Sequence, residues 1–251
     1  MKIKFVGTGS GETSLKRFHS AFIINHRNYS LLVDAGDGIS RALLNQNILY
    51  NDIDGILFSH FHPDHYCGLP SLIVQMKISR RAKPLTIASH RSRIGFLKEF
   101  LKSSLLFEER LGFEIKFLPF VAEHKFKINS DIEIIAKNNT HIAKFDEYNE
   151  DDFSFSFIFK INKKNIVYTG DVGSKDDLFL FKDEIIDVFI TETTHINFED
   201  IISALENILP KKTILTHISS EDETGITALI KKNKDRFSII AAFDGFIETF
   251  N

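Results

Sequence analysis

The sequence is short of several residue types, and each shortage excludes a class of protein. Its 251 residues include one cysteine, Cys67, so no internal disulfide is expected, and a reducing, cytoplasmic location is predicted. There is no tryptophan but there are 25 phenylalanines, which predicts a core filled by phenylalanine and isoleucine. No apolar run approaches the ~20 residues that a membrane span needs, and no signal peptide opens the chain. We therefore expect no membrane partner.

A strong net charge is missing as well, since 31 basic side chains are balanced by 34 acidic ones. A chain this close to neutral does not attract long polyanions through its overall charge. The one local excess of positive charge lies between Lys77 and Lys102. It is typical either of a phosphate-attracting rim or of an ordinary solvated helix face.

No linker rich in proline or serine divides the chain, and predicted strands alternate with predicted helices along it. Apolar alternation predicts strand hairpins in residues 20–34 and 153–169. Helices are predicted at 39–46, 70–79 and 91–105. The second half then repeats strand and helix in turn, at 188–191, 198–209, 213–215, 223–232 and 238–241. This alternation predicts one domain, residues 1–251, in which two sheets pack together with helices outside.

The stretch from Ser59 to Leu69 reads SHFHPDHYCGL, and it holds metal-binding side chains at high density. The candidate ligands are His60, His62, Asp64 and His65. The run before the stretch is typical of a buried strand, so these side chains follow the carboxyl end of a strand, where α/β proteins place their sites. In an extended turn, His60 and His62 would point the same way and bind one ion, with Asp64 and His65 placed to reach a second.

Three later candidate ligands, His141, Asp171 and His217, each come after a predicted strand. A carboxylate or imidazole at the end of a strand projects into a shared cleft. Two further candidates, Glu192 and His195, lie between a predicted strand and a predicted helix. The structural alternative is that His195 only begins a helix and has no role in a site.

The pattern H-x-H-x-D-H followed by Gly68 resembles the signature of the metallo-β-lactamase superfamily, and with the later positions the resemblance covers nearly the whole chain. It implies an α/β fold, namely a four-layer αββα sandwich of two mixed β-sheets flanked by helices. It also implies two divalent metal ions. The first would be bound by His60, His62 and His141, the second by Asp64, His65 and His217, with Asp171 bridging the two. A set of nitrogen and oxygen ligands without thiolate favours zinc, with manganese or iron as alternatives.

The same resemblance implies a hydrolase whose nucleophile is a hydroxide that bridges the metal ions, because bound cations depress the pKa of water. Asp64 is expected to act in catalysis as well as in metal binding. In ribonuclease Z and its phosphodiesterase relatives a histidine oriented by a glutamate assists the leaving group, and His195 with Glu192 resembles that pair. Asp34 resembles the aspartate of a D-x-G turn that supports the metal loop from behind.

Ribonuclease Z clamps transfer RNA with a long arm, and the short stretch between His141 and Asp171 has no room for one. We therefore expect a small cyclic or nucleotide phosphodiester as substrate, ahead of RNA 3′ ends or longer nucleic acid. The alternative is a thioesterase or lactonase of the same fold that attacks an acyl carbon. The helical substrate domain typical of glyoxalase II is not expected after His217.

A scaffold protein is a further alternative, but superfamily members that serve as scaffolds usually lose ligands, and all seven are present here. The resemblance also implies a homodimer. Substrate choice is expected to depend on loops, namely Gly7–Thr13, the pair Arg91 and Arg93, and Phe145–Asp152.

Overall fold

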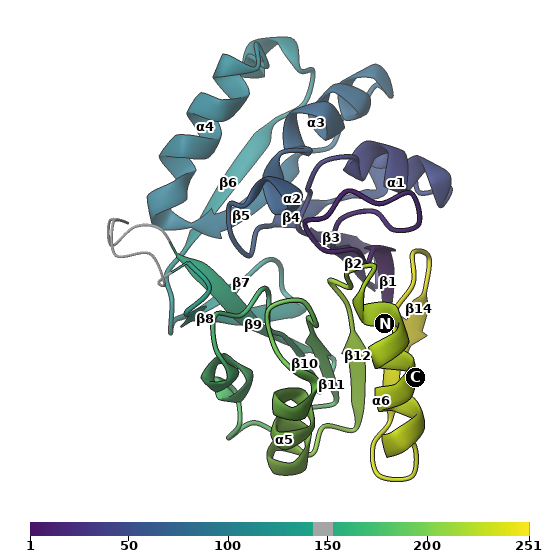
Figure 1. The fold of residues 1–251 in the computed structure, drawn as a ribbon. Helices are drawn as coiled ribbons and strands as arrows, with labels where there is room; N and C mark the ends of the chain where they lie inside the picture. Colours follow the sequence, from purple (N-terminus) through teal and green to yellow (C-terminus); the bar gives the residue numbers. More distant parts are fainter. Residues whose placement is uncertain (143–152, 251) are drawn as a thin grey trace. The chain divides into compact units, whose positions relative to one another are not determined.

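A computed structural model describes residues 1–142 and 153–250, and its contacts divide the chain into two compact units (Figure 1). The first unit comprises Met1–Gly7, Leu15–Val121 and Asp244–Asn251, and the second comprises Thr8–Ser14 and Ala122–Phe243. Within the described residues, each unit contains one seven-stranded sheet. The single domain of residues 1–251 stays a prediction.

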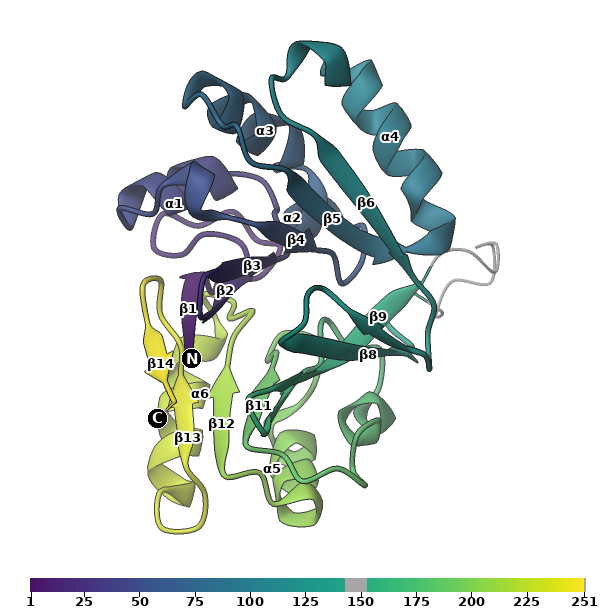
Figure 2. The same cartoon turned by 180° about the vertical axis from the view of Figure 1, so that it is seen from behind.

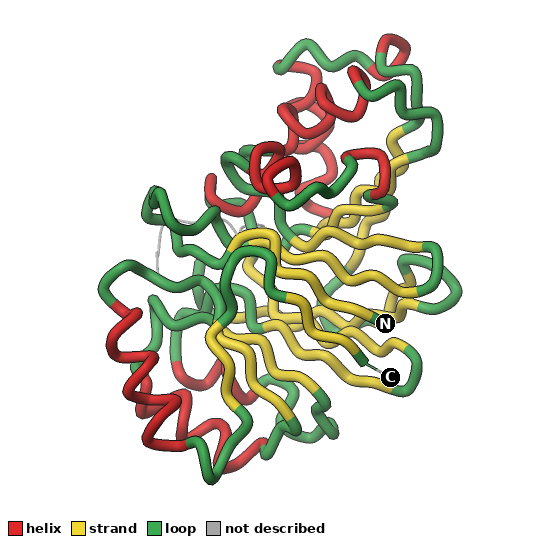
Figure 3. Tube along the Cα trace, turned by 90° about the vertical axis from the view of Figure 1, so that its right-hand side faces the viewer, coloured by secondary structure: helices red, strands yellow, loops and turns green. Residues whose placement is uncertain are grey.

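The sheet of the first unit is mixed, with the strand order β14-β1-β2-β3-β4-β5-β6. The pairings from β14 to β3 are antiparallel, and those from β3 to β6 are parallel. Its strands are β1 (Lys2–Gly7), β2 (Ala21–His26), β3 (Tyr29–Val33), β4 (Gly55–Leu57), β5 (Leu85–His90), β6 (Ile115–Phe120) and β14 (Ile247–Thr249). Strands from the two ends of the chain, β1 and β14, run side by side (Figure 3).

Helices cover one face of this sheet, as Figures 1 and 2 show. The helical segments are α1 (Ile39–Asn45), η1 (Tyr50–Asp52), α2 (Pro63–Tyr66), α3 (Leu69–Ile78), η2 (Arg91–Arg93), α4 (Ile94–Ser103) and η3 (Glu108–Arg110). Apolar side chains of α1, α3 and α4 form one buried cluster with those of the strands, among them Leu43, Leu72, Leu97 and Ile56. Burial of this apolar face is what stabilises helices as short as these.

The sheet of the second unit is also mixed, with the order β13-β12-β11-β10-β9-β8-β7. The pairings from β13 to β10 are parallel, and those from β10 to β7 are antiparallel. Its strands are β7 (Lys125–Lys127), β8 (Ile132–Asn139), β9 (Ser154–Ile161), β10 (Lys164–Tyr168), β11 (Val188–Thr191), β12 (Lys212–Leu215) and β13 (Ile239–Ala241). The helical segments are η4 (Lys175–Phe179), α5 (Phe198–Ile208) and α6 (Asp222–Asn233). Side chains of α5 and α6, such as Leu205 and Ile226, form the second buried cluster with the strands.

The two mixed sheets with helices confirm the predicted α/β fold class. The predicted helix 91–105 is interrupted, because Arg91–Arg93 form a 3-10 turn before α4 begins at Ile94. The short strands β7 and β14 had no clear sequence signal. In the part of the chain that the structure describes, no helix has the length and apolar character to cross a membrane.

Candidate metal centre

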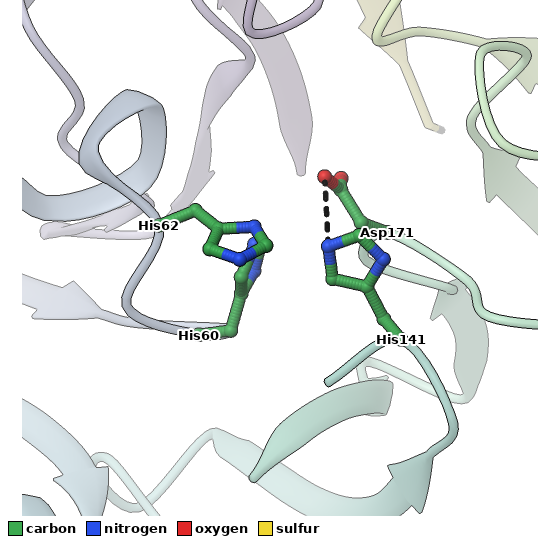
Figure 4. A group of neighbouring side chains, drawn as sticks. All are labelled: His60, His62, His141 and Asp171. Carbon is green, nitrogen blue, oxygen red and sulfur yellow. Dashed lines mark ion pairs between the residues drawn. The ribbon is translucent and has the colours of Figure 1, made fainter. Parts of the chain in front are cut away.

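In the first unit, candidate ligands follow the carboxyl end of β4, as predicted. The rings of His60 and His62 meet edge to face with their centroids 4.8 Å apart, and each presents a nitrogen within 4.8 Å of the other (Figure 4). The ring centroid of His65 lies 4.0 Å from that of His60. The predicted pairing of His60 with His62 on one side of the loop is therefore present in the fold.

The predicted extended turn is wrong beyond His62. Residues Pro63–Tyr66 form one turn of helix, α2, with His62 in an extended conformation just before it. Proline is favoured at the first helical position because its fixed φ suits the helix and its missing N–H has no partner to lose. The helical turn brings Asp64 back beside its neighbour, with Oδ2 of Asp64 3.3 Å from Nε2 of His65.

Asp34 supports this loop from behind, which confirms its predicted role. Its carboxylate accepts hydrogen bonds from the backbone N–H of Ser59 at 2.7 Å, from the Ser59 hydroxyl at 2.7 Å and from Nδ1 of His65 at 2.9 Å. Because the carboxylate fixes a proton on Nδ1, the lone pair of His65 is on Nε2, the atom next to Asp64. The turn is also tightly packed, since a Cβ on Gly36 would lie 1.7 Å from the backbone oxygen of Asp64.

In the second unit, candidate ligands come from the ends of three strands. His141 follows β8, Asp171 follows β10 and His217 follows β12. Oδ2 of the buried Asp171 lies 3.8 Å from Nε2 of His141, the ion pair drawn in Figure 4, and 3.2 Å from Nε2 of His217. One carboxylate oxygen thus faces two imidazoles that come from different strands.

His217 has a backbone conformation that few residues adopt. Its φ is 51°, in the left-handed region that costs a non-glycine residue free energy. Thr194 Oγ1 donates a hydrogen bond of 2.6 Å to the His217 carbonyl, and the next residue, Ile218, pairs with Gly9 in a parallel bridge. The loop Gly7–Thr13 therefore contacts Ile218, the residue that follows the candidate ligand His217.

The predicted pair of Glu192 and His195 is present in the second unit. One carboxylate oxygen of the fully buried Glu192 lies 2.8 Å from Nδ1 of His195, and the other accepts the backbone N–H of His195, also at 2.8 Å. The His195 side chain is 35% exposed, and its ring centroid lies 4.7 Å from that of His141 and 5.4 Å from that of His217. Glu192 thus contacts both the backbone and the ring of a histidine that stays partly exposed.

Aromatic residues surround the first candidate ligands. Phe61, between His60 and His62, has its ring centroid 5.2 Å from that of Tyr66 and 5.6 Å from that of Phe96 on α4. Burial raises the pKa of the Tyr66 hydroxyl, so this tyrosine stays neutral at neutral pH. The guanidinium carbon of Arg93 lies 5.9 Å from the centroid of the Phe61 ring. A cation is therefore held beside the ligand loop.

Sequence reasoning missed two polar residues that contact the loops of the second unit's candidate ligands. Asn139 Oδ1 accepts the backbone N–H of His141 at 3.3 Å, and its side-chain amide donates to the Thr169 carbonyl at 3.0 Å. Asp177 contacts both the loop of His141 and the loop of Asp171. The spacing of Ser174 and Asp177 is typical of a helix start, and this signal could have drawn attention to Asp177. The predicted substrate loop Phe145–Asp152 lies outside the described residues.

Solved structures of other proteins have a similar fold. YhfI from Bacillus subtilis, a metallo-β-lactamase fold protein, is similar over 98% of both chains, with a TM-score of 0.78 and 20% sequence identity. The short form of human tRNase Z is similar over 100% of both chains, with a TM-score of 0.75 and 18% identity. The predicted metallo-β-lactamase fold is confirmed.

Sequence comparisons narrow the class to a family. Ribonuclease Z from Aeropyrum pernix is 33% identical over 114 residues, which are 45% of this chain and 36% of that enzyme, so the match spans well under half of the relative. This likeness confirms the predicted resemblance to the ribonuclease Z-like branch of the superfamily. The family model described as anti-Pycsar protein Apyc1 matches residues 1–237, and the chain belongs to that family.

Proposed function

We propose that the chain is a metal-dependent hydrolase that binds two divalent metal ions. The first ion is bound by His60, His62 and His141, the second by Asp64, His65 and His217, and Asp171 bridges the two. The donor set supports this assignment, because it consists of imidazole nitrogens and carboxylate oxygens without a thiolate. Such ligands suit zinc, with manganese and iron as alternatives.

The observation that carries the proposal is the position of Asp171. Its Oδ2 lies within 4 Å of Nε2 of both His141 and His217, which are assigned to different ions. A carboxylate buried beside two imidazoles is suited to hold positive charge, because burial strengthens the electrostatic interaction between them. This position supports the assignment of Asp171 as the bridging ligand.

When bound, two such ions lower the pKa of water and offset the charge of an attacked phosphate group. The chain's own residues hold protons at defined atoms. Glu192 keeps a proton on Nδ1 of His195, so a second proton on Nε2 of that ring can be donated to the departing oxygen. Asp64, beside Nε2 of His65, serves as a ligand and orients the attacking water.

A phosphodiester is the substrate that the first unit supports best. The parallel strands β4 and β5 have their carboxyl ends at the same edge of the sheet, so His60 and His62 share that edge with Arg91 and Arg93. The guanidinium of Arg93, beside the ring of Phe61, is placed to bind an anionic group. We propose a small cyclic or nucleotide phosphodiester, with RNA 3′ ends as a further substrate of the same chemistry.

The other properties expected of the protein belong to the same proposal. We propose that residues 1–251 act as one hydrolase domain, which is supported by the single family model that matches residues 1–237. We also propose a cytoplasmic homodimer without a membrane partner. Sedimentation equilibrium on the metal-loaded protein tests the dimer, which predicts twice the 28.7 kDa of one chain.

Hydrolysis of four substrates by the zinc- or manganese-loaded protein tests the function. The set is bis(p-nitrophenyl) phosphate, a cyclic mononucleotide, a thioester and a lactone at equal concentration, with Asp171→Ala as the matched variant. We expect cleavage of the phosphodiesters by the native chain, and a fall to background in Asp171→Ala because the bridge between the ions is lost. Turnover of an acyl substrate with silence on both phosphodiesters would overturn the phosphodiesterase and favour a thioesterase or lactonase.

A further inference from the structure

Two ligand-bearing loops of the second unit touch along their backbones. One loop carries Thr140 and His141 after β8, and the other runs from Asp171 to Ser174 after β10. A Cβ added to Gly173 would lie 2.1 Å from the Thr140 carbonyl oxygen, which is far inside van der Waals contact. The two loops are therefore packed as closely as a glycine permits.

A single buried carboxylate, that of Asp177, joins these loops. Its Oδ2 accepts hydrogen bonds from the Thr140 hydroxyl at 2.8 Å and from the backbone N–H of Gly173 at 2.8 Å. The backbone N–H groups of Thr140 and Ser174 donate to the same carboxylate at 3.1 Å. The side chain is 4% exposed, so water competes little for these bonds.

Helix capping explains only part of this arrangement. Ser174 and Asp177 form a capping box at the start of η4, and that motif requires the bond from the Ser174 N–H to the Asp177 side chain. It does not require the two bonds from Thr140, which lies 37 residues away in the chain, or the bond from Gly173. The additional bonds reach the residue directly before one candidate ligand and the second residue after another.

We infer that Asp177 is a positioning residue that fixes His141 and Asp171 relative to each other for metal binding. This inference rests on the proposed function, because it treats both residues as ligands. Each ligand is attached to a backbone segment that Asp177 holds, so loss of the carboxylate frees both segments at once. Residues that hold ligands from behind typically change metal affinity by about 10- to 100-fold when they are replaced.

The test is metal affinity measured separately from activity. The native chain, Asp177→Ala and Asp177→Asn are titrated with Co²⁺ against a chromophoric chelator, the d–d absorption of Co²⁺ reports ligand geometry, and urea unfolding reports stability. We expect Asp177→Ala to weaken Co²⁺ binding by about 10- to 100-fold and to change the absorption spectrum. Asp177→Asn should have a smaller effect, because its amide oxygen can still accept the Gly173 and Ser174 N–H groups.

Asp187 offers a matched control within the same unit. It is also a buried carboxylate, and it accepts the backbone N–H of Asn165 at 3.0 Å and the ammonium of Lys211 at 2.8 Å. It precedes β11, so it lies at the opposite strand end from the candidate ligands. Asp187→Ala should lower stability without changing the Co²⁺ affinity or spectrum.

The following outcomes decide whether Asp177 positions His141 and Asp171. Weaker Co²⁺ binding in Asp177→Ala than in Asp187→Ala at similar stability supports the inference. Equal Co²⁺ binding and unchanged spectra in both variants would overturn it while leaving the metal site intact, whereas a native chain that binds no metal would overturn the proposed function itself. If Asp177→Ala does not fold, Gly173→Ala separates the same two loops, and unaltered Co²⁺ affinity in that variant and in Asp177→Asn would also overturn the inference.

Discussion

The two units present their candidate ligands in different ways. In the first unit, four of them lie within six consecutive positions, and Asp34 supports the loop through Ser59 and His65. In the second unit, the candidate ligands come from three strand ends. The carboxylate of Asp177 contacts the loops of His141 and Asp171, and that of Glu192 contacts His195, which is not assigned as a ligand. A contiguous loop needs one support, whereas ligands that are distant in sequence need several.

This difference decides how damage should spread in each unit. A substitution behind the loop of His60–His65 should weaken metal binding by that loop. A substitution in the second unit should affect either metal binding or proton transfer and leave the other unchanged. The supporting carboxylates are buried in both units. When one of them is substituted, water therefore cannot replace the hydrogen bonds that are lost. The following predictions test the comparison, from the largest effect to the smallest.

His195→Ala should separate catalysis from metal binding in the second unit. We expect turnover of a phosphodiester to fall by about 10²- to 10⁴-fold, since general-acid assistance is lost, while metal content is unchanged. Steady-state kinetics and elemental analysis on the same sample measure both quantities. His124→Ala is the control, because His124 is exposed and contacts only the nearby Ala122 carbonyl among the bonds described. Loss of a metal ion in His195→Ala would make this histidine a ligand.

Asp34→Asn should weaken metal binding through the first unit. The amide puts an N–H₂ group opposite a donor, either the Ser59 hydroxyl or Nδ1 of His65, so we expect metal affinity to fall by about 10- to 100-fold. Asp54→Asn is the matched control, since Asp54 accepts the Ser30 N–H at the amino end of β4. Equal metal affinities in the two variants, determined by chelator competition, would argue against a supporting role for Asp34.

Arg93→Ala should affect substrate binding more than turnover. An anionic group that loses its guanidinium partner at a partly exposed site should bind about 10-fold more weakly, which raises KM for a cyclic nucleotide and leaves kcat largely unchanged. Arg110→Ala serves for comparison, because Arg110 lies 5.7 Å from the Phe107 ring in a similar cation–aromatic contact outside the ligand loop. The same KM in both variants would remove Arg93 from the substrate edge.

The smallest effect is expected for Asp187→Asn, which should lower the free energy of unfolding by an amount that depends on pH. Burial raises the pKa of Asp187, but hydrogen bonds from Lys211 and the Asn165 N–H outweigh it, so the pKa is lowered overall. A lowered pKa means stabilisation that is present above the unfolded value of about 3.9 and is lost as pH falls through the folded value. We expect Asp187→Asn to cost about 1 kcal/mol at pH 7 and less at pH 3. Urea unfolding at both pH values measures this, and an equal loss at both would exclude the charge as the cause.

The pairing of His60 with His62 could be predicted from the sequence, because their spacing places both side chains on one side of an extended segment. Strand ends also predicted the positions of Asp171 and His217, since apolar runs mark where buried strands stop. The one-turn helix α2 was missed because Pro63, which favours a helix start, lies among four candidate ligands that were interpreted as a loop.

Other features could not be predicted because they depend on distant segments. The bonds of Asp177 to Thr140 form only when β8 and β10 bring their loops together, and no local pattern encodes that contact. Strand β14 has three residues and exists by pairing with β1 at the other end of the chain. Such short edge strands have weak intrinsic preference and are specified by their partners.

The most direct test of the account is the number of metal ions bound per chain. The native protein and Asp171→Ala are dialysed against the same low concentration of free Zn²⁺, and their zinc content is measured by elemental analysis. The account predicts two ions in the native chain and at most one in Asp171→Ala, because the pair of ions needs the bridging carboxylate. Two tightly bound ions in Asp171→Ala, or none in the native chain, would contradict it.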